Sequence, residues 1–160
     1  GNIFISMGQE AGKAYLQKLK QQNIAKSTAS ARQILDLVIA GEYPLSIQIF
    51  NHHAYISKTA GAPVEWQPLE PVTATNNSIG LAKNAPHPHA SMLFLDFVLS
   101  RKGQRIFQAA NYLPAHPDVP ALQADLKPGV RFKKANYLGP EILFDKSDEW
   151  SDYFEKEFLR

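Results

Sequence analysis

Two adjacent histidines, within the stretch FNHHAY at residues 50–55, are the side chains of this sequence best suited to hold a ligand. Neutral imidazoles bind transition metals through a ring lone pair, and imidazole N–H groups donate hydrogen bonds to anions. If His52 and His53 begin a helix, the free backbone amides there also favour negative charge. The structural alternative is that one histidine caps the helix and the other is solvated. Asn51 and Tyr55 flank the pair and are candidates for the same pocket.

A second group of polar side chains accompanies the predicted start of an earlier helix. Ser27, Thr28 and Ser30 carry hydroxyl groups, and Arg32 lies just inside that helix. Hydroxyls and a guanidinium at a helix N-terminus can bind an oxyanion. A capped helix with a solvated arginine is the simpler interpretation of the same residues.

His87 and His89 flank Pro88 at a spacing found in some metal sites. Proline suits the first turn of a helix, so a helix start explains this segment better than metal ligation. The sequence contains no nucleophile elbow and no H-E-x-x-H motif. It also has no cysteine to act as a nucleophile or a thiolate ligand. The sequence therefore offers no recognisable catalytic machinery.

The composition is that of a soluble globular domain. The 160 residues are 44% hydrophobic and 20% charged, with a formal net charge of +2. The basic residues are scattered, which argues against a nucleic-acid-binding surface. The densest apolar stretch, Met92 to Leu99, contains Asp96 and is far shorter than the roughly 20 residues that span a bilayer.

The sequence predicts alternating strands and helices in the first part of the chain. The pattern predicts a strand at residues 1–5, a helix at 6–22, a helix from Ser27 or Thr28 to Gly41, a strand at 45–49 and a helix at 51–59. The two histidines then stand where a strand passes into a helix. In α/β sheets, ligands bind in the crevice beyond the carboxyl ends of the strands, which is where this corner falls.

The rest of the chain continues the α/β pattern, with less regularity. The sequence predicts short strands at 64–66, 72–74 and 78–82, one helix from Pro88 to Phe107, a loop with one helical turn at 112–130 and an amphipathic helix at 147–160. The helix from Pro88 is apolar around most of its circumference. Such a helix is normally buried on several sides.

Three stretches give the sequence a family resemblance. They are LVIAGEYPLSIQIFNHHAYISKTAGAPVEWQPLEPV, GLAKNAPHPHASMLFLDFVLSRKGQRIF and NYLPAHP. Together they resemble the periplasmic substrate-binding proteins of ABC importers, in the extracellular solute-binding family that includes the ferric-iron-binding proteins. The resemblance extends from about residue 1 to residue 125 and weakens in the tail.

The resemblance implies a type II binding protein, in which two α/β lobes close over a solute and deliver it to a membrane permease. The chain would be the C-terminal half of such a protein, with a signal peptide upstream and a periplasmic location. Residues 1–76 would form a segment of the second lobe with the ligand corner. Residues 77–129 would return to the first lobe, and residues 130–160 would pack back on the second.

Ferric-binding relatives carry two tyrosines after an asparagine at the corner that Asn51, His52 and His53 occupy here. The resemblance therefore implies a bound metal ion such as iron, or a small anion. Imidazole is softer than a phenolate, which places ferric specificity in doubt.

Two other kinds of protein remain as alternatives to a solute-binding protein. One is a truncated module that binds no ligand and self-associates, because the apolar helix from Pro88 has lost part of the sheet that buries it. The other is a metal-dependent hydrolase, which would need carboxylates grouped with the histidines. The nearest acidic residues, Glu42 and Glu65, lie outside the corner.

Overall fold

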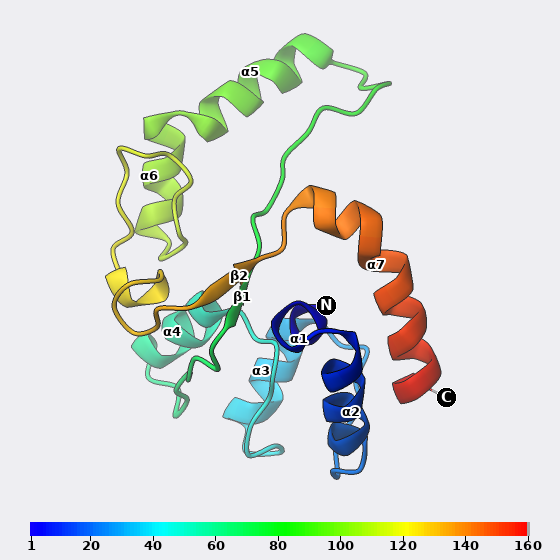
Figure 1. Cartoon of the computed structure of the whole chain (residues 1–160). Helices are drawn as coiled ribbons and strands as arrows, with labels where there is room; N and C mark the ends of the chain where they lie inside the picture. The colour runs from blue at the N-terminus through cyan, green and yellow to red at the C-terminus, as the bar shows by residue number, and fades with distance from the viewer. Residues whose placement is uncertain (160) are drawn as a thin grey trace. The chain divides into compact units, whose positions relative to one another are not determined.

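The computed structural model describes residues 1–159 (Figure 1). These residues divide into two compact units. The first unit contains residues 1–29, 69–76 and the chain from Lys133 onward. The second contains residues 30–68 and 77–132. The chain thus passes into the second unit twice. The assignment of segments to the lobes of a larger binding protein stays a prediction.

The first unit begins with two helices, α1 (Asn2–Met7) and α2 (Gln9–Lys20). Gly8 separates them at a φ of 76°, a left-handed conformation that glycine adopts without steric cost. The two helices pack closely at Gly12, where an added Cβ would lie 2.8 Å from Cδ1 of Phe4. The strand predicted for residues 1–5 is therefore wrong, and the helix predicted from residue 6 begins at Gln9.

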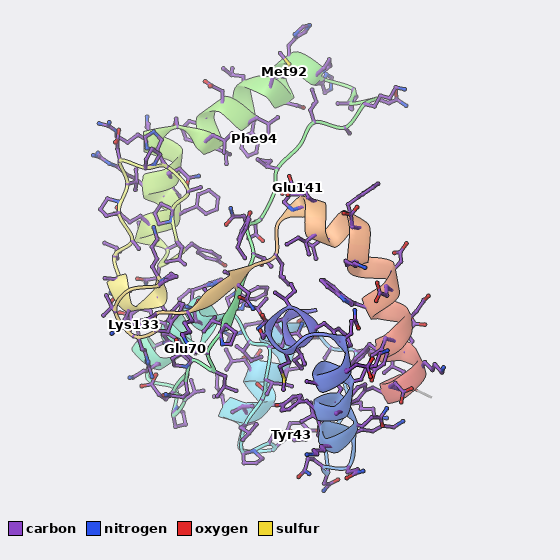
Figure 2. All side chains as sticks on the ribbon, in the orientation of Figure 1. Tyr43, Glu70, Met92, Phe94, Lys133 and Glu141 are labelled. Carbon is purple, nitrogen blue, oxygen red and sulfur yellow. The ribbon has the colours of Figure 1, made fainter. Side chains whose placement is uncertain are left out.

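A two-stranded parallel sheet joins distant parts of the first unit. Strand β1 (Val72–Ala74) pairs with β2 (Ala135–Tyr137), so that Thr73 lies opposite Asn136. The Asn136 amide donates hydrogen bonds to Asn2 Oδ1 at 2.7 Å and Ser6 Oγ at 2.8 Å. Next to the sheet, the carboxylate of Glu70 accepts hydrogen bonds from the backbone amides of Lys133 and Lys134 (Figure 2). The bonds to Asn2 and Ser6, which are four residues apart and share a helix face, hold α1 against β2.

The C-terminal segment completes the first unit. Helix α7 (Pro140–Phe154) runs into a π-helical turn, η2 (Glu155–Leu159). Phe4 packs edge-on against Tyr153 with ring centroids 5.3 Å apart, and Gln17 donates a hydrogen bond to Glu157 at 2.7 Å. The predicted C-terminal helix is confirmed as far as the described residues extend, although it begins seven residues earlier than expected; Arg160 lies outside them.

The second unit opens with α3 (Ala31–Ile39) and α4 (Asn51–Thr59). A capping box formed by Ser30 and Gln33 starts α3, so Ser30 caps the helix instead of Ser27 or Thr28. Gly41, at a φ of 80°, ends the helix as predicted. The residues between the two helices include Gln48 at a φ of 66° and form no strand, which corrects the strand predicted at 45–49.

Two further helices, α5 (Pro88–Leu99) and α6 (Arg101–Ala109), replace the single helix predicted from Pro88 to Phe107. Ser100 adopts an extended conformation between them, and its hydroxyl accepts a hydrogen bond from the amide of Gly103. A serine N-cap therefore starts α6 where the first helix would have continued. The predicted single turn in the following loop is the 3₁₀ helix η1 (Ala124–Leu126).

The buried side chains of the second unit come mainly from α3, α4 and the loops. The buried hydrophobic ones are Leu35, Ala54, Val119, Leu126 and Phe132, and the buried polar ones include Ser57 and Gln104. In contrast, α5 has no buried residue, and Leu93 and Phe94 are 71% and 61% exposed. Figure 2 shows Met92 and Phe94 projecting from this helix. The expectation that α5 is buried on several sides is wrong.

The described residues thus form a mainly helical structure with one small sheet. The strands predicted at 64–66 and 78–82 are irregular, whereas the strand at 72–74 is confirmed. Within residues 1–159, no helix combines the length and the apolar character that crossing a membrane requires.

Candidate functional site

The histidine corner is the first turn of α4 together with the residue before it. Phe50, in an extended conformation, is the N-cap residue and offers no side-chain hydrogen bond to the helix. Asn51 takes over this function, because its Oδ1 accepts a hydrogen bond from the His52 amide at 2.8 Å. Its amide nitrogen donates to the Leu126 carbonyl at 2.9 Å. The asparagine therefore fixes the start of α4 against η1, and the idea that a histidine caps this helix is wrong.

The two imidazole rings lie against each other. Their centroids are 4.4 Å apart, and the Phe50 ring stands 5.7 Å from His52 and 5.5 Å from His53. Adjacent residues of a helix do not share a face, so the rings meet through the rotamers of the two side chains. Nδ1 of His53 is buried and has no hydrogen-bond partner within the described chain. A buried ring nitrogen without a partner is costly, so its presence here calls for an explanation.

Both histidines are held in the neutral form at pH 7. Burial lowers the pKa of His52 to about 4, and the neighbouring His53 adds to the effect. Burial also lowers the pKa of His53, with a further contribution from the positive charge of Arg32. Neutral rings offer a lone pair to a metal ion and an N–H group to an anion, so these pKa shifts are compatible with either ligand class.

Arg32 supplies the positive charge beside the corner. It extends from α3, where Nη2 pairs with Asp36 at 2.6 Å and Nη1 donates a hydrogen bond to Ser57 of α4 at 2.8 Å. The hydroxyl of Ser57 is buried, and the guanidinium therefore ties α3 to α4. Of the polar group predicted at the start of α3, only Arg32 is associated with the histidines.

Other predicted residues lie elsewhere. Ser27 and Thr28 are exposed and belong to the first unit, where the Ser27 hydroxyl accepts a hydrogen bond from the Ala29 amide at 3.1 Å. Tyr55 is half-buried on α4 and shows no ring contact with either histidine among the described residues. His87 is the N-cap residue of α5, in agreement with a helix starting at Pro88.

Tyr112 was missed by the sequence analysis as a member of the corner. Its ring centroid lies 4.8 Å from that of His52 and 6.5 Å from that of His53. The segment NYLPAHP was noticed only for its family resemblance. Sequence could not pair residues 60 positions apart, although the asparagine before Tyr112 is a signal for the end of a helix.

Two surface hollows were found, and neither is lined by His52 or His53. One hollow is lined by Pro140, Glu141, Phe144 and Asp145, and another by Ile5, Ser6, Pro71 and residues 133–136. Both are shallow and belong to the first unit. We favour the corner because its buried, unpartnered ring nitrogen lies beside a second imidazole, whereas Ser6 and Asn136 of the second hollow already bond each other. Nε1 of Trp150 in α7 is also buried without a partner among the described residues, but Trp150 lines neither hollow. No group of three metal-ligating His, Asp or Glu side chains occurs within residues 1–159.

The comparisons with known proteins identify one family. A family model described as bacterial extracellular solute-binding protein matches residues 3–113, which is more than half of the chain. No curated protein and no solved structure matches the sequence.

Proposed function

Because the chain belongs to the bacterial extracellular solute-binding proteins, we propose that it is part of the binding component of an ABC importer and that the histidine corner contacts the solute. The family places the protein in the periplasm or outside the bacterial cell. Its members typically bind a small solute, pass it to a transporter and catalyse no reaction. The membrane permease is the partner that this function requires.

The observation that carries the proposal is the unpartnered, buried Nδ1 of His53 beside a second neutral imidazole. A structural histidine pair would normally satisfy its buried nitrogen with a neighbouring group. The corner also lies within the residues that the family model matches. Solute binding explains why two polar rings are held together at the start of α4.

The charge of the corner favours an anion as the solute. Arg32 adds to the lowering of the His53 pKa that burial causes, so its positive charge acts at the corner although its Nη2 pairs with Asp36. Two neutral imidazoles without a carboxylate do not balance the charge of iron(III). A small anion, either free or carrying a metal ion such as iron, fits the imidazole N–H donors better.

The experiment replaces His52 and His53 by alanine in the full-length protein and measures binding by isothermal titration calorimetry. The probes are inorganic phosphate, sulfate, iron(III) citrate and free iron(III). We expect the double variant to lose about 3–6 kcal/mol of anion binding, from two hydrogen bonds to a charged group. The thermal unfolding midpoint should change little.

The matched control replaces His87, the exposed N-cap residue of α5, and His89, exposed within α5, by alanine. This control should bind the same probe as the unmodified protein. Unaltered affinity in the His52/His53 variant would remove the corner from the binding site. Tight binding of free iron(III) with no anion binding would overturn the proposed solute class.

A further inference from the structure

Helix α6 ends in a hydrogen-bonded arrangement that fixes the direction of the following chain. The amide of Asn111 donates to the Gln108 carbonyl at 2.9 Å, and the amide of Tyr112 donates to the Phe107 carbonyl at 3.0 Å. Asn111 has a φ of 62°, the left-handed conformation that such a helix end requires. This is a Schellman motif with asparagine in the place usually taken by glycine.

The motif places the ring of Tyr112 between α6 and α4. Phe107 and Tyr112 pack edge-on with centroids 6.3 Å apart, which is the apolar contact that often accompanies this kind of helix end. On its other side, Tyr112 approaches His52 to 4.8 Å. A row of rings therefore runs from Phe107 through Tyr112, His52 and His53 to Phe50.

We infer that Tyr112 is a positioning residue for His52, and that the left-handed conformation of Asn111 sets its place. The inference rests on the proposed function, because it gives the end of α6 a role in orienting a solute-binding imidazole. His52 has ring neighbours on both sides, and removing one frees it to change rotamer. An immobilised side chain binds more tightly than one that must be ordered on binding.

Two independent pairs of variants test this role in the full-length protein. Tyr112→Phe keeps the ring, whereas Tyr112→Ala removes it. Asn111→Gly keeps the left-handed conformation, whereas Asn111→Val opposes it, because a β-branched residue is strained at a positive φ. Asn111→Val displaces Tyr112 without altering its side chain. The two disruptive variants therefore remove the contact of Tyr112 with His52 in two independent ways.

The first measurement uses no solute. In NMR spectra of protein labelled at its histidine rings, we expect the His52 ring signals to shift in Tyr112→Ala and Asn111→Val. In Tyr112→Phe and Asn111→Gly, the His52 signals should stay at the positions that they have in the unmodified protein. The His87 and His89 signals should stay unchanged in all four variants. Unchanged His52 signals in both disruptive variants would overturn the inference.

The second measurement is the affinity for inorganic phosphate. We expect about two- to tenfold weaker binding in the two disruptive variants and unchanged binding in the two conservative ones. Weaker binding in Tyr112→Phe with intact His52 signals would replace the positioning role by direct contact through the hydroxyl. If phosphate binds none of the proteins, the proposed solute class fails for phosphate, while the NMR signals still decide the role of Tyr112.

Discussion

Helices α4 and α5 show opposite relations between composition and burial. Helix α4, with the sequence NHHAYISKT, is polar, yet Ala54 and Ser57 are buried in it. Helix α5, with the sequence PHASMLFLDFVL, is the more apolar of the two, yet none of its residues is buried. The composition of a helix therefore indicates which residues it can bury, and the elements that pack against the helix determine which residues are buried.

The neighbours of the two helices differ in kind. Helix α4 packs against α3, receives a hydrogen bond from Arg32 and is tied to η1 through Asn51. Helix α5 packs mainly against α6, the helix that follows it. The candidate site is thus built on the element with the more varied contacts, which is the kind of support that a binding constellation requires.

The largest change in stability should come from replacing a buried leucine by alanine, and the same replacement of an exposed leucine is its control. Leu35 of α3 is 2% exposed, and Leu93 of α5 is 71% exposed. We expect Leu35→Ala to lower the free energy of unfolding by about 2–5 kcal/mol, through lost burial and a cavity. Leu93→Ala should change it by no more than about 0.5 kcal/mol. Urea denaturation measures both values, and equal losses would mean that α5 is covered in solution.

A smaller effect should follow from removing one hydroxyl. Ser57→Ala deprives the Arg32 guanidinium of its partner on α4, and we expect a loss of about 1–3 kcal/mol in unfolding free energy. Ser91→Ala on α5 is the control, because its hydroxyl bonds the His87 carbonyl on an exposed surface. Denaturation of the two variants side by side provides the test. A neutral Ser57→Ala would show that Arg32 does not stabilise the α3–α4 pair.

The smallest expected effect is on the pH dependence of folding stability. The pKa of His52 is about 4 in the folded protein and about 6.5 in the unfolded chain. Between these pH values the unfolded state binds a proton that the folded state does not, so stability falls as the pH drops from about 6.5 to about 4. The ring is only partly buried and solvent reduces the effect. Urea midpoints across this range should decrease less in His52→Gln, and identical curves would contradict the low pKa.

The local sequence determined several elements by itself. The bounds of α4, the end of α3 at Gly41 and the start of α5 at Pro88 follow from helix periodicity, a glycine that tolerates positive φ and a proline in the first turn. Each of these signals acts over one or two turns of chain. The histidine pair was recognised in the same way, since His52 and His53 are adjacent. The family resemblance was also carried by the sequence, and the matching family model confirms the solute-binding family.

Tertiary structure decided the rest. Residues 1–5 have the β-branched composition of a strand, but contacts of Asn2 with Asn136 and of Phe4 with Tyr153 hold the segment as a helix. Tyr112 reaches His52 only because the folded chain brings the end of α6 to the start of α4. Intrinsic backbone preferences are worth less than about 1 kcal/mol per residue, so contacts between residues distant in sequence can override them. The same physical reason explains the exposure of α5: its sequence provides an apolar surface, and only a packed neighbour can bury it.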